Sequence, residues 1–199
     1  MPAQIYSELK SRVENGATLY ISNDDGILSD FNRLAGVTVN DSETKYNSGC
    51  FKLNGKNVNY GRLRNYIITA ENAEVLAIDE NGMPIFTKNR YGKGTVYYLN
   101  FPIEKNLIDV CDGFENSQNE VYSEIFKAAK NNRPLVCENK YIGITRHIKD
   151  NLQWFTMINY SSMEQKTNIQ IKSNFKYEVL KGNIEKIAPF EMTILKIEE

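Results

Sequence analysis

The sequence predicts an α/β domain followed by a small antiparallel β sandwich. Before residue 133, apolar residues at helical spacing alternate with short apolar runs that end in glycine turns, which is typical of mixed helices and strands. After Arg133-Pro134 the helical spacing disappears, and short strands separated by turns continue to the end of the chain. We therefore expect two domains, residues 1–133 and residues 134–199.

The first domain opens with helices and a strand in alternation. A first helix is indicated by apolar residues four apart in the sequence, namely Ile5, Leu9 and Val13. Asn15-Gly16 would end that helix, and the apolar run 18–22 then predicts a buried strand. A second short helix is expected over residues 28–34, ending at Gly36. Residues 38–49 are polar, and we interpret them as a loop.

Glycine turns organise the middle of this domain. Asn54-Gly55 predicts a hairpin over residues 50–60, because both positions of a type I′ turn need positive φ. Further short strands are expected at residues 67–68, 75–78, 85–86 and 96–99. Gly92-Lys93-Gly94 is interpreted as a hairpin turn, because it has neither the spacing nor the Ser or Thr of a phosphate-binding loop.

A last helix closes the first domain, and strands fill the second. Ser117-x-x-Glu120 has the pattern of a capping box, and the apolar residues after it would line one helix face as far as Asn131-Asn132. The strands expected in the second domain cover residues 135–138, 142–148, 152–159, 167–171, 177–180 and 192–197.

Composition narrows the class of protein. The chain has 199 residues, of which 41% are hydrophobic and 11% aromatic, enough to bury a core. Its net charge of -1 gives no general attraction to nucleic acid or to an anionic membrane, and no apolar run approaches the roughly 20 residues that span a bilayer. The opening MPAQIYSELK lacks the features of a signal peptide, so we expect a cytoplasmic protein without nucleic-acid or membrane partners.

Cysteine and histidine usage argues against a metal centre. The three cysteines, Cys50, Cys111 and Cys137, are far apart, and His147 is the single histidine. A Cys/His zinc site needs closely spaced pairs of such ligands, which the sequence does not contain. We therefore expect buried free thiols, no metal site and no cofactor.

Diffuse motifs in both predicted domains resemble one family. In the first domain they are the strand residues Glu74 to Asp79 and Pro84 to Lys88, followed by Gly92-x-Gly94 leading into Tyr97-Tyr98. In the second they are Asn159-Tyr160-Ser161-Ser162, Leu180-x-Gly182, Pro189 and the last apolar strand. The first set resembles the amidotransferase-like domain of glycoside hydrolases, called the trimerisation domain in the family 42 β-galactosidases. The second set resembles the small β domain that closes those chains.

The resemblance implies a fold and a role. It implies that the first domain is flavodoxin-like, as in class I amidotransferases, and lacks catalysis of its own. An active glutamine amidotransferase places a nucleophilic cysteine on a strained turn after a strand. The matching turn, residues 22–26, has no cysteine. Its Asp24-Asp25 pair consists of residues that are common in turns, so we interpret it as a solvated turn. We therefore assign no catalytic, cofactor-binding or metal-binding residue.

Glycoside hydrolysis by this chain is also not expected. Enzymes of the resembled type carry their two carboxylates on a TIM barrel of about 250 residues, which is longer than this chain. We interpret the chain as a non-catalytic C-terminal part of a glycoside hydrolase that supports or oligomerises an absent catalytic barrel. Its expected partners are that barrel and a second copy of the chain. The alternative is a carbohydrate-binding module in the second domain, with an aromatic platform for a sugar partner made of Trp154, Phe155 and the tyrosine-rich set.

Overall fold

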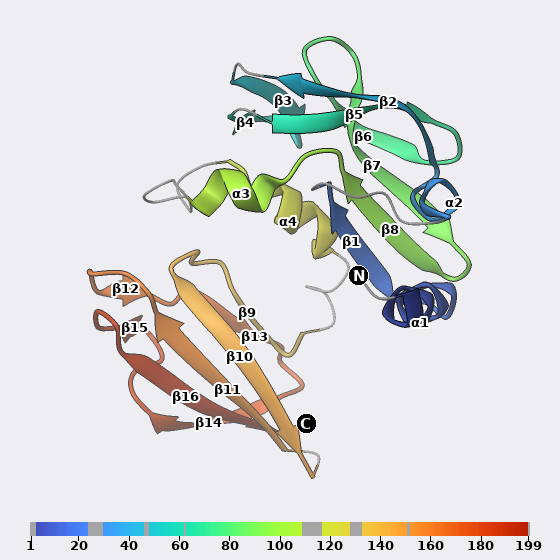
Figure 1. The fold of residues 1–199 in the computed structure, drawn as a ribbon. Helices are drawn as coiled ribbons and strands as arrows, with labels where there is room; N and C mark the ends of the chain where they lie inside the picture. The colour runs from blue at the N-terminus through green and yellow to red at the C-terminus, as the bar shows by residue number, and fades with distance from the viewer. Residues whose placement is uncertain are drawn as a thin grey trace. The chain divides into compact units, whose positions relative to one another are not determined.

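The chain folds into two compact units. The structure is a computed structural model that describes residues 3–23, 30–45, 48–61, 63–108, 117–127, 133–150 and 152–198. Unit 1 comprises Met1–Ile125 and unit 2 comprises Phe126–Glu199. Figure 1 shows unit 1 in blue to yellow and unit 2 in orange to red, and each unit is described by itself. No helix in the described ranges is long and apolar enough to cross a membrane.

A mixed four-stranded sheet forms the centre of unit 1. Its strands lie in the order β1 (Thr18–Ser22), β8 (Gly94–Leu99), β7 (Pro84–Tyr91) and β6 (Glu74–Ile78). The β1–β8 pair is parallel, whereas the β8–β7 and β7–β6 pairs are antiparallel. A flavodoxin-like sheet would be predominantly parallel, so the described residues do not confirm the predicted flavodoxin-like arrangement.

Four helices and a hairpin pack against this sheet. Helices α1 (Ala3–Glu14) and α2 (Phe31–Ala35) share a core cluster with β8, which includes Val13, Leu34 and Val96. The second cluster contains residues of α3 (Ile103–Ile108) and α4 (Asn119–Ile125) together with Tyr97 and Leu99 of β8. Because alternate residues of a strand point to opposite faces, these clusters lie on the two faces of the sheet.

Two small antiparallel sheets complete unit 1. Strands β3 (Gly49–Leu53) and β4 (Lys56–Tyr60) form the predicted hairpin, with positive φ of 52° at Asn54 and 78° at Gly55. Strands β2 (Val37–Lys45) and β5 (Leu63–Ala70) pair from end to end, with one register shift between Val39 and Asp41. The prediction of a loop over residues 38–49 was therefore wrong. All the described side chains of β2 beyond Val39 are exposed or half-buried, so the strand carries no apolar alternation that a sequence pattern would reveal.

The end of unit 1 corrects a second local prediction. Helix α4 forms, but the Ser117 hydroxyl does not cap it and donates instead to the carbonyl of Asn57. Glu120, in the first turn of α4, forms an ion pair with Lys56, at 2.5 Å between Nζ and Oε1. The two residues of the apparent capping box thus connect α4 to β4.

Unit 2 is built of antiparallel strands. A four-stranded sheet has the order β10 (Ile142–Lys149), β11 (Leu152–Asn159), β16 (Met192–Glu198) and β14 (Lys176–Lys181). The short strands β9 (Leu135–Cys137) and β13 (Ile169–Ile171) form one pair. The shorter strands β12 (Gln165–Lys166) and β15 (Lys186–Ile187), which the sequence did not predict, form another.

One apolar core holds these sheets of unit 2 together. Phe155 and Met157 of β11 and Leu195 and Ile197 of β16 are fully buried, and side chains of β9, β13 and β15 pack against them. The predicted strands of this unit are confirmed in kind and approximate position. The finer description of the unit as a sandwich is not confirmed.

Candidate functional site

The Gly92-x-Gly94 turn lies against the end of helix α1. Lys93 donates its backbone N–H to the carbonyl of Glu14, at 2.9 Å. A Cβ atom on Gly94 would lie 2.1 Å from the carbonyl oxygen of Val13 and 2.3 Å from that of Ala17. The prediction of a hairpin turn is confirmed. The glycine at position 94 serves close backbone packing, which leaves no room for a bound phosphate.

A cluster of tyrosines and one glutamate joins helices α3 and α4 to strand β1. The Tyr122 hydroxyl donates to Oε1 of Glu104 at 2.9 Å, and the Tyr122 ring packs edge-on against Tyr20 at 5.9 Å between centroids. Burial raises the pKa of both tyrosines, and the neighbouring Glu104 carboxylate raises it further. Phenols held neutral in this way do not supply a base at neutral pH, and the Tyr122 hydroxyl acts as a hydrogen-bond donor.

Buried asparagines fix backbone segments in both units. In unit 1, Asn100 accepts hydrogen bonds from the Tyr66 N–H and the Tyr98 hydroxyl, and its amide donates to the Tyr66 carbonyl. In unit 2, Asn159 is fully buried at the end of β11. It accepts from the N–H and hydroxyl of Ser161, so the Asn159-Tyr160-Ser161-Ser162 motif begins with a structural residue.

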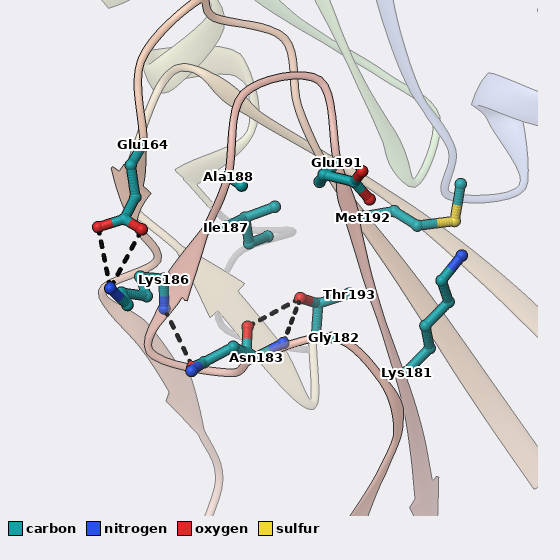
Figure 2. A pocket seen from close by; sticks show the side chains of 10 residues that line it. All are labelled: Glu164, Lys181, Gly182, Asn183, Lys186, Ile187, Ala188, Glu191, Met192 and Thr193. Atoms are coloured by element: carbon teal, nitrogen blue, oxygen red, sulfur yellow. Dashed lines mark hydrogen bonds and ion pairs between the residues drawn. The ribbon is translucent and has the colours of Figure 1, made fainter.

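Unit 2 contains a surface hollow of about 290 Å³, shown in Figure 2. Ten residues line it, namely Glu164, Lys181, Gly182, Asn183, Lys186, Ile187, Ala188, Glu191, Met192 and Thr193. At its base the Thr193 hydroxyl donates to the Asn183 carbonyl at 2.8 Å and accepts from the Asn183 N–H at 3.2 Å. A Cβ atom on Gly182 would lie 2.6 Å from that hydroxyl oxygen, so the Leu180-x-Gly182 motif also serves packing.

The hollow lacks the surroundings of a glycosidase centre. Glu164 is ion-paired with Lys186 at 3.1 Å, and its side chain is 53% exposed. Glu191 lies on the opposite side of the hollow in Figure 2 and is also exposed. The catalytic acid of a glycosidase lies in a sheltered, partly apolar pocket, whereas both of these carboxylates are exposed to solvent. Sequence reasoning predicted the Lys181-Gly182-Asn183 turn but not the hollow, because Glu164 comes from a separate segment of the chain.

The remaining residues singled out by the sequence lie apart from one another. Cys50 on β3 and Cys137 on β9 are free and half-buried, and the Cys137 thiol donates to the Thr167 carbonyl at 2.8 Å between Sγ and O. Burial raises the pKa of that thiol. His147 on β10 is exposed.

The predicted aromatic platform does not form as expected. Trp154 and Phe155 are adjacent on β11, so their side chains point to opposite faces of the sheet. Phe155 is buried in the core, whereas Trp154 is half-buried on the other face. Asp24-Asp25 and Cys111 lie outside the described residues. Among the residues that are described, no group of three or more His, Cys, Asp or Glu side chains could hold a metal ion.

Comparison with known proteins decides the family. The profile described as "Beta-galactosidase trimerisation domain" matches residues 5–112, which is more than half of the chain. The chain belongs to the β-galactosidase trimerisation domain family. Membership confirms the resemblance found in the sequence. It also places the Gly92-x-Gly94 turn and the strands around it within the part that defines this trimerisation domain. Curated protein sequences gave no significant match to the domain.

Solved structures similar to this chain share its fold across both units. A catalytic mutant of Gan42B, a GH42 β-galactosidase from G. stearothermophilus, matches 100% of this chain with a TM-score of 0.68 and 17% identity. The β-galactosidase from Bacillus circulans sp. alkalophilus matches 98% with a TM-score of 0.67 and 15% identity. The enzyme from Rahnella sp. R3 matches 98% with a TM-score of 0.70 and 15% identity. The chain spans only 30%, 31% and 30% of the length of these three proteins.

Proposed function

We propose that this chain is a non-catalytic accessory part of a glycoside hydrolase, which joins copies of the enzyme and supports its catalytic barrel. The observation that carries the proposal is the match of residues 5–112 to the trimerisation domain of β-galactosidases. The similar β-galactosidases are about three times as long as the chain, which leaves room in such a protein for a barrel of about 250 residues. The chain would then be the C-terminal part of its parent enzyme.

The chemistry of the described residues supports a role without catalysis. His147 is exposed and lies in unit 2. Cys137, whose thiol pKa is raised by burial, lies in the same unit, whereas Cys50 lies in unit 1. A nucleophilic cysteine needs a histidine within hydrogen-bond reach and surroundings that lower the pKa of its thiol. The surroundings of Cys137 instead raise the pKa of its thiol. The comparisons give no support to the alternative role as a carbohydrate-binding module.

The finer structural predictions belong with this proposal. We propose that unit 1 is a variant of the flavodoxin-like fold in which antiparallel strands β7 and β6 complete the sheet, and that unit 2 is a small sandwich. The domain division at residues 133 and 134 stays a prediction, close to the division between the compact units at Ile125. Two free, half-buried thiols are compatible with a reducing cytoplasm, the location we propose.

Three measurements on the purified chain test the proposal. Hydrolysis of aryl β-galactosides and ammonia release from glutamine are measured beside an intact GH42 β-galactosidase at equal molarity, and we expect no turnover from this chain. Sedimentation velocity gives the mass in solution, and we expect an oligomer at high concentration. Ammonia release that Cys50→Ala, Cys111→Ala or Cys137→Ala abolishes would overturn the proposal, as would glycoside turnover that co-purifies with the chain.

A further inference from the structure

The sequence contains three Asn-Gly pairs, at residues 15–16, 54–55 and 81–82. Such a pair is prone to lose the asparagine amide, because the glycine nitrogen has no neighbouring side chain to shield it and can attack the side-chain carbonyl carbon. The attack needs a glycine N–H that water can deprotonate and a backbone that can bend into a five-membered ring. An N–H held in a hydrogen bond is protected from deprotonation, as it is from hydrogen exchange. The hydrogen bonds at each pair therefore decide which one reacts.

Hydrogen bonds hold the pair at the end of helix α1. Gly16 donates its N–H to the Val13 carbonyl at 2.9 Å. The N–H of Asn15 and its side-chain amide both donate to the Ser11 carbonyl, at 3.1 and 2.9 Å. The nucleophile and the leaving amide are thus both held, so we expect this pair to react slowly.

A buried aspartate holds the pair in the β6–β7 turn. The Gly82 N–H donates to the Asp79 carbonyl at 3.0 Å. The N–H groups of Asn81 and Met83 both donate to Oδ1 of Asp79 at 2.9 Å, and the Asp79 side chain is buried. The backbone on both sides of Gly82 is therefore fixed, which opposes the bending that ring closure requires.

The pair Asn54-Gly55, at the tip of the β3–β4 hairpin, is held least. Both residues are exposed, and a Cβ atom on Gly55 would meet no heavy atom within 4 Å. Within the described ranges the Gly55 N–H has no hydrogen-bond partner. The Asn54 amide donates to Oε2 of Glu124 at 3.1 Å, a single contact at the surface. The nucleophile of this pair is thus open to water.

We propose that Asn54 is a site of spontaneous deamidation, in which the Gly55 backbone nitrogen is the nucleophile. That nitrogen gives its proton to water and bonds to Cγ of Asn54, while the bond from Cγ to Nδ2 breaks and the amide leaves as ammonia. Water then opens the succinimide ring at one of its two carbonyl carbons, giving aspartate or an isoaspartate whose main chain runs through Cγ. The reaction consumes one water, releases one ammonia and needs no oxidant or cofactor.

Deamidation changes a contact between the hairpin and helix α4. A carboxylate replaces the amide that donates to Glu124, so two carboxylates face each other. Isoaspartate also adds an atom to the main chain of a two-residue turn, whose length sets the register of the strands. Deamidated chains should therefore open the hairpin more readily, with faster hydrogen exchange of the β3 and β4 amides.

Incubation of the folded chain in heavy-oxygen water at mildly alkaline pH tests the site. Mass spectrometry of peptides locates the incorporated oxygen, and we expect it at position 54 before positions 15 and 81. Gly55→Ala should slow the reaction of Asn54 by about tenfold or more, a barrier higher by about 1.4 kcal/mol. The matched control is Gly82→Ala, since Gly82 has a φ of 79° beside 78° for Gly55 and equally open space. It should leave the rate at Asn54 unchanged.

Three outcomes would overturn this assignment. They are earlier labelling of position 15 or 81, a rate at Asn54 that Gly55→Ala does not change, and the same ranking of the three pairs in urea, where their hydrogen bonds are lost. Unchanged exchange of the β3 and β4 amides in Asn54→Asp would overturn the effect on the hairpin. The inference does not depend on the accessory role, because Asn54 releases ammonia once per chain and glutamine turnover would release it continuously.

Discussion

Replacement of Asn159 by aspartate should severely destabilise unit 2. The Asn159 side chain is 0% exposed, and its amide nitrogen lies 2.7, 3.0 and 3.1 Å from the carbonyl oxygens of Met163, Ile187 and Ala188. Asp has the same shape but has no amide protons to donate. At neutral pH its carboxylate would instead face these three carbonyl oxygens, while the bonds accepted from Ser161 remain.

The contacts set the size of the effect. An amide nitrogen has two protons, so at least two hydrogen bonds are lost, and each buried acceptor left without a donor costs about 1–3 kcal/mol. Repulsion between the buried carboxylate and the carbonyl oxygens adds to this, so we expect a loss of about 3–5 kcal/mol in the free energy of unfolding. For a unit of this size, such a loss lowers the melting temperature by about 12 °C or more.

Tryptophan fluorescence reports this change selectively. The chain has one tryptophan, Trp154, which lies on β11 in unit 2, so its emission follows the unfolding of this unit. Urea unfolding of Asn159→Asp is compared with Asn174→Asp, which makes the same chemical change at an exposed position before β14. Burial should raise the pKa of the introduced carboxyl. The loss should therefore shrink as the pH falls below that pKa, because the protonated acid can donate one hydrogen bond. Equal midpoints for the two variants at neutral pH would refute the role assigned to Asn159.

Two further predictions concern unit 1. Gly94→Ala should lower the free energy of unfolding by about 3 kcal/mol or more, because its Cβ would lie 2.1 Å from the Val13 carbonyl oxygen. Gly82→Ala, the control, has open space around its Cβ. It should lose only about 1 kcal/mol, because its φ of 79° is unfavourable for alanine. Circular dichroism during urea unfolding measures both, and equal effects would contradict the packing role of the turn. Unit 1 should also lose stability as the pH rises above 10.0, the ordinary pKa of tyrosine. Burial raises the pKa of several tyrosines that must stay neutral while folded, among them Tyr20, Tyr98 and Tyr122. Phenolate absorbance should then rise together with unfolding, and smooth titration of all tyrosines in the folded protein would count against it.

The sequence predicted elements well where side-chain pattern and burial agree. Strand β11 alternates Phe155, Met157 and Asn159 toward the core with half-buried residues on the other face, and its predicted bounds equal the observed ones. Asn54-Gly55 predicted its hairpin because the turn chemistry is local. Strand β2 was not predicted, because it is stabilised by pairing with β5. That partner lies distant in the sequence, so the local pattern of residues 37–45 does not reveal the strand.

Local motifs misled where their side chains serve distant segments. Ser117 and Glu120 have capping-box spacing, yet they bind Asn57 and Lys56 of β4. The hollow in unit 2 could not be predicted for the same reason, since its wall combines Glu164 with residues of the segment 181–193. Capping-box spacing predicts a local hydrogen bond only if the two side chains have no other partner. Distant segments that the tertiary structure brings close can provide such partners.

The motifs that pointed to the family share a physical feature in the structure. Gly94 allows the β7–β8 turn to approach the carbonyl groups of Val13 and Ala17, and Gly182 makes the same kind of close approach to Thr193. Asn159 hydrogen-bonds the backbone of segments up to 29 positions away in the sequence. Each of these residues has a task that depends on its size or its amide, and none of these tasks requires a proton transfer or a nucleophile. A pattern made of packing and backbone-binding residues specifies a shape, and this agrees with the accessory role proposed above.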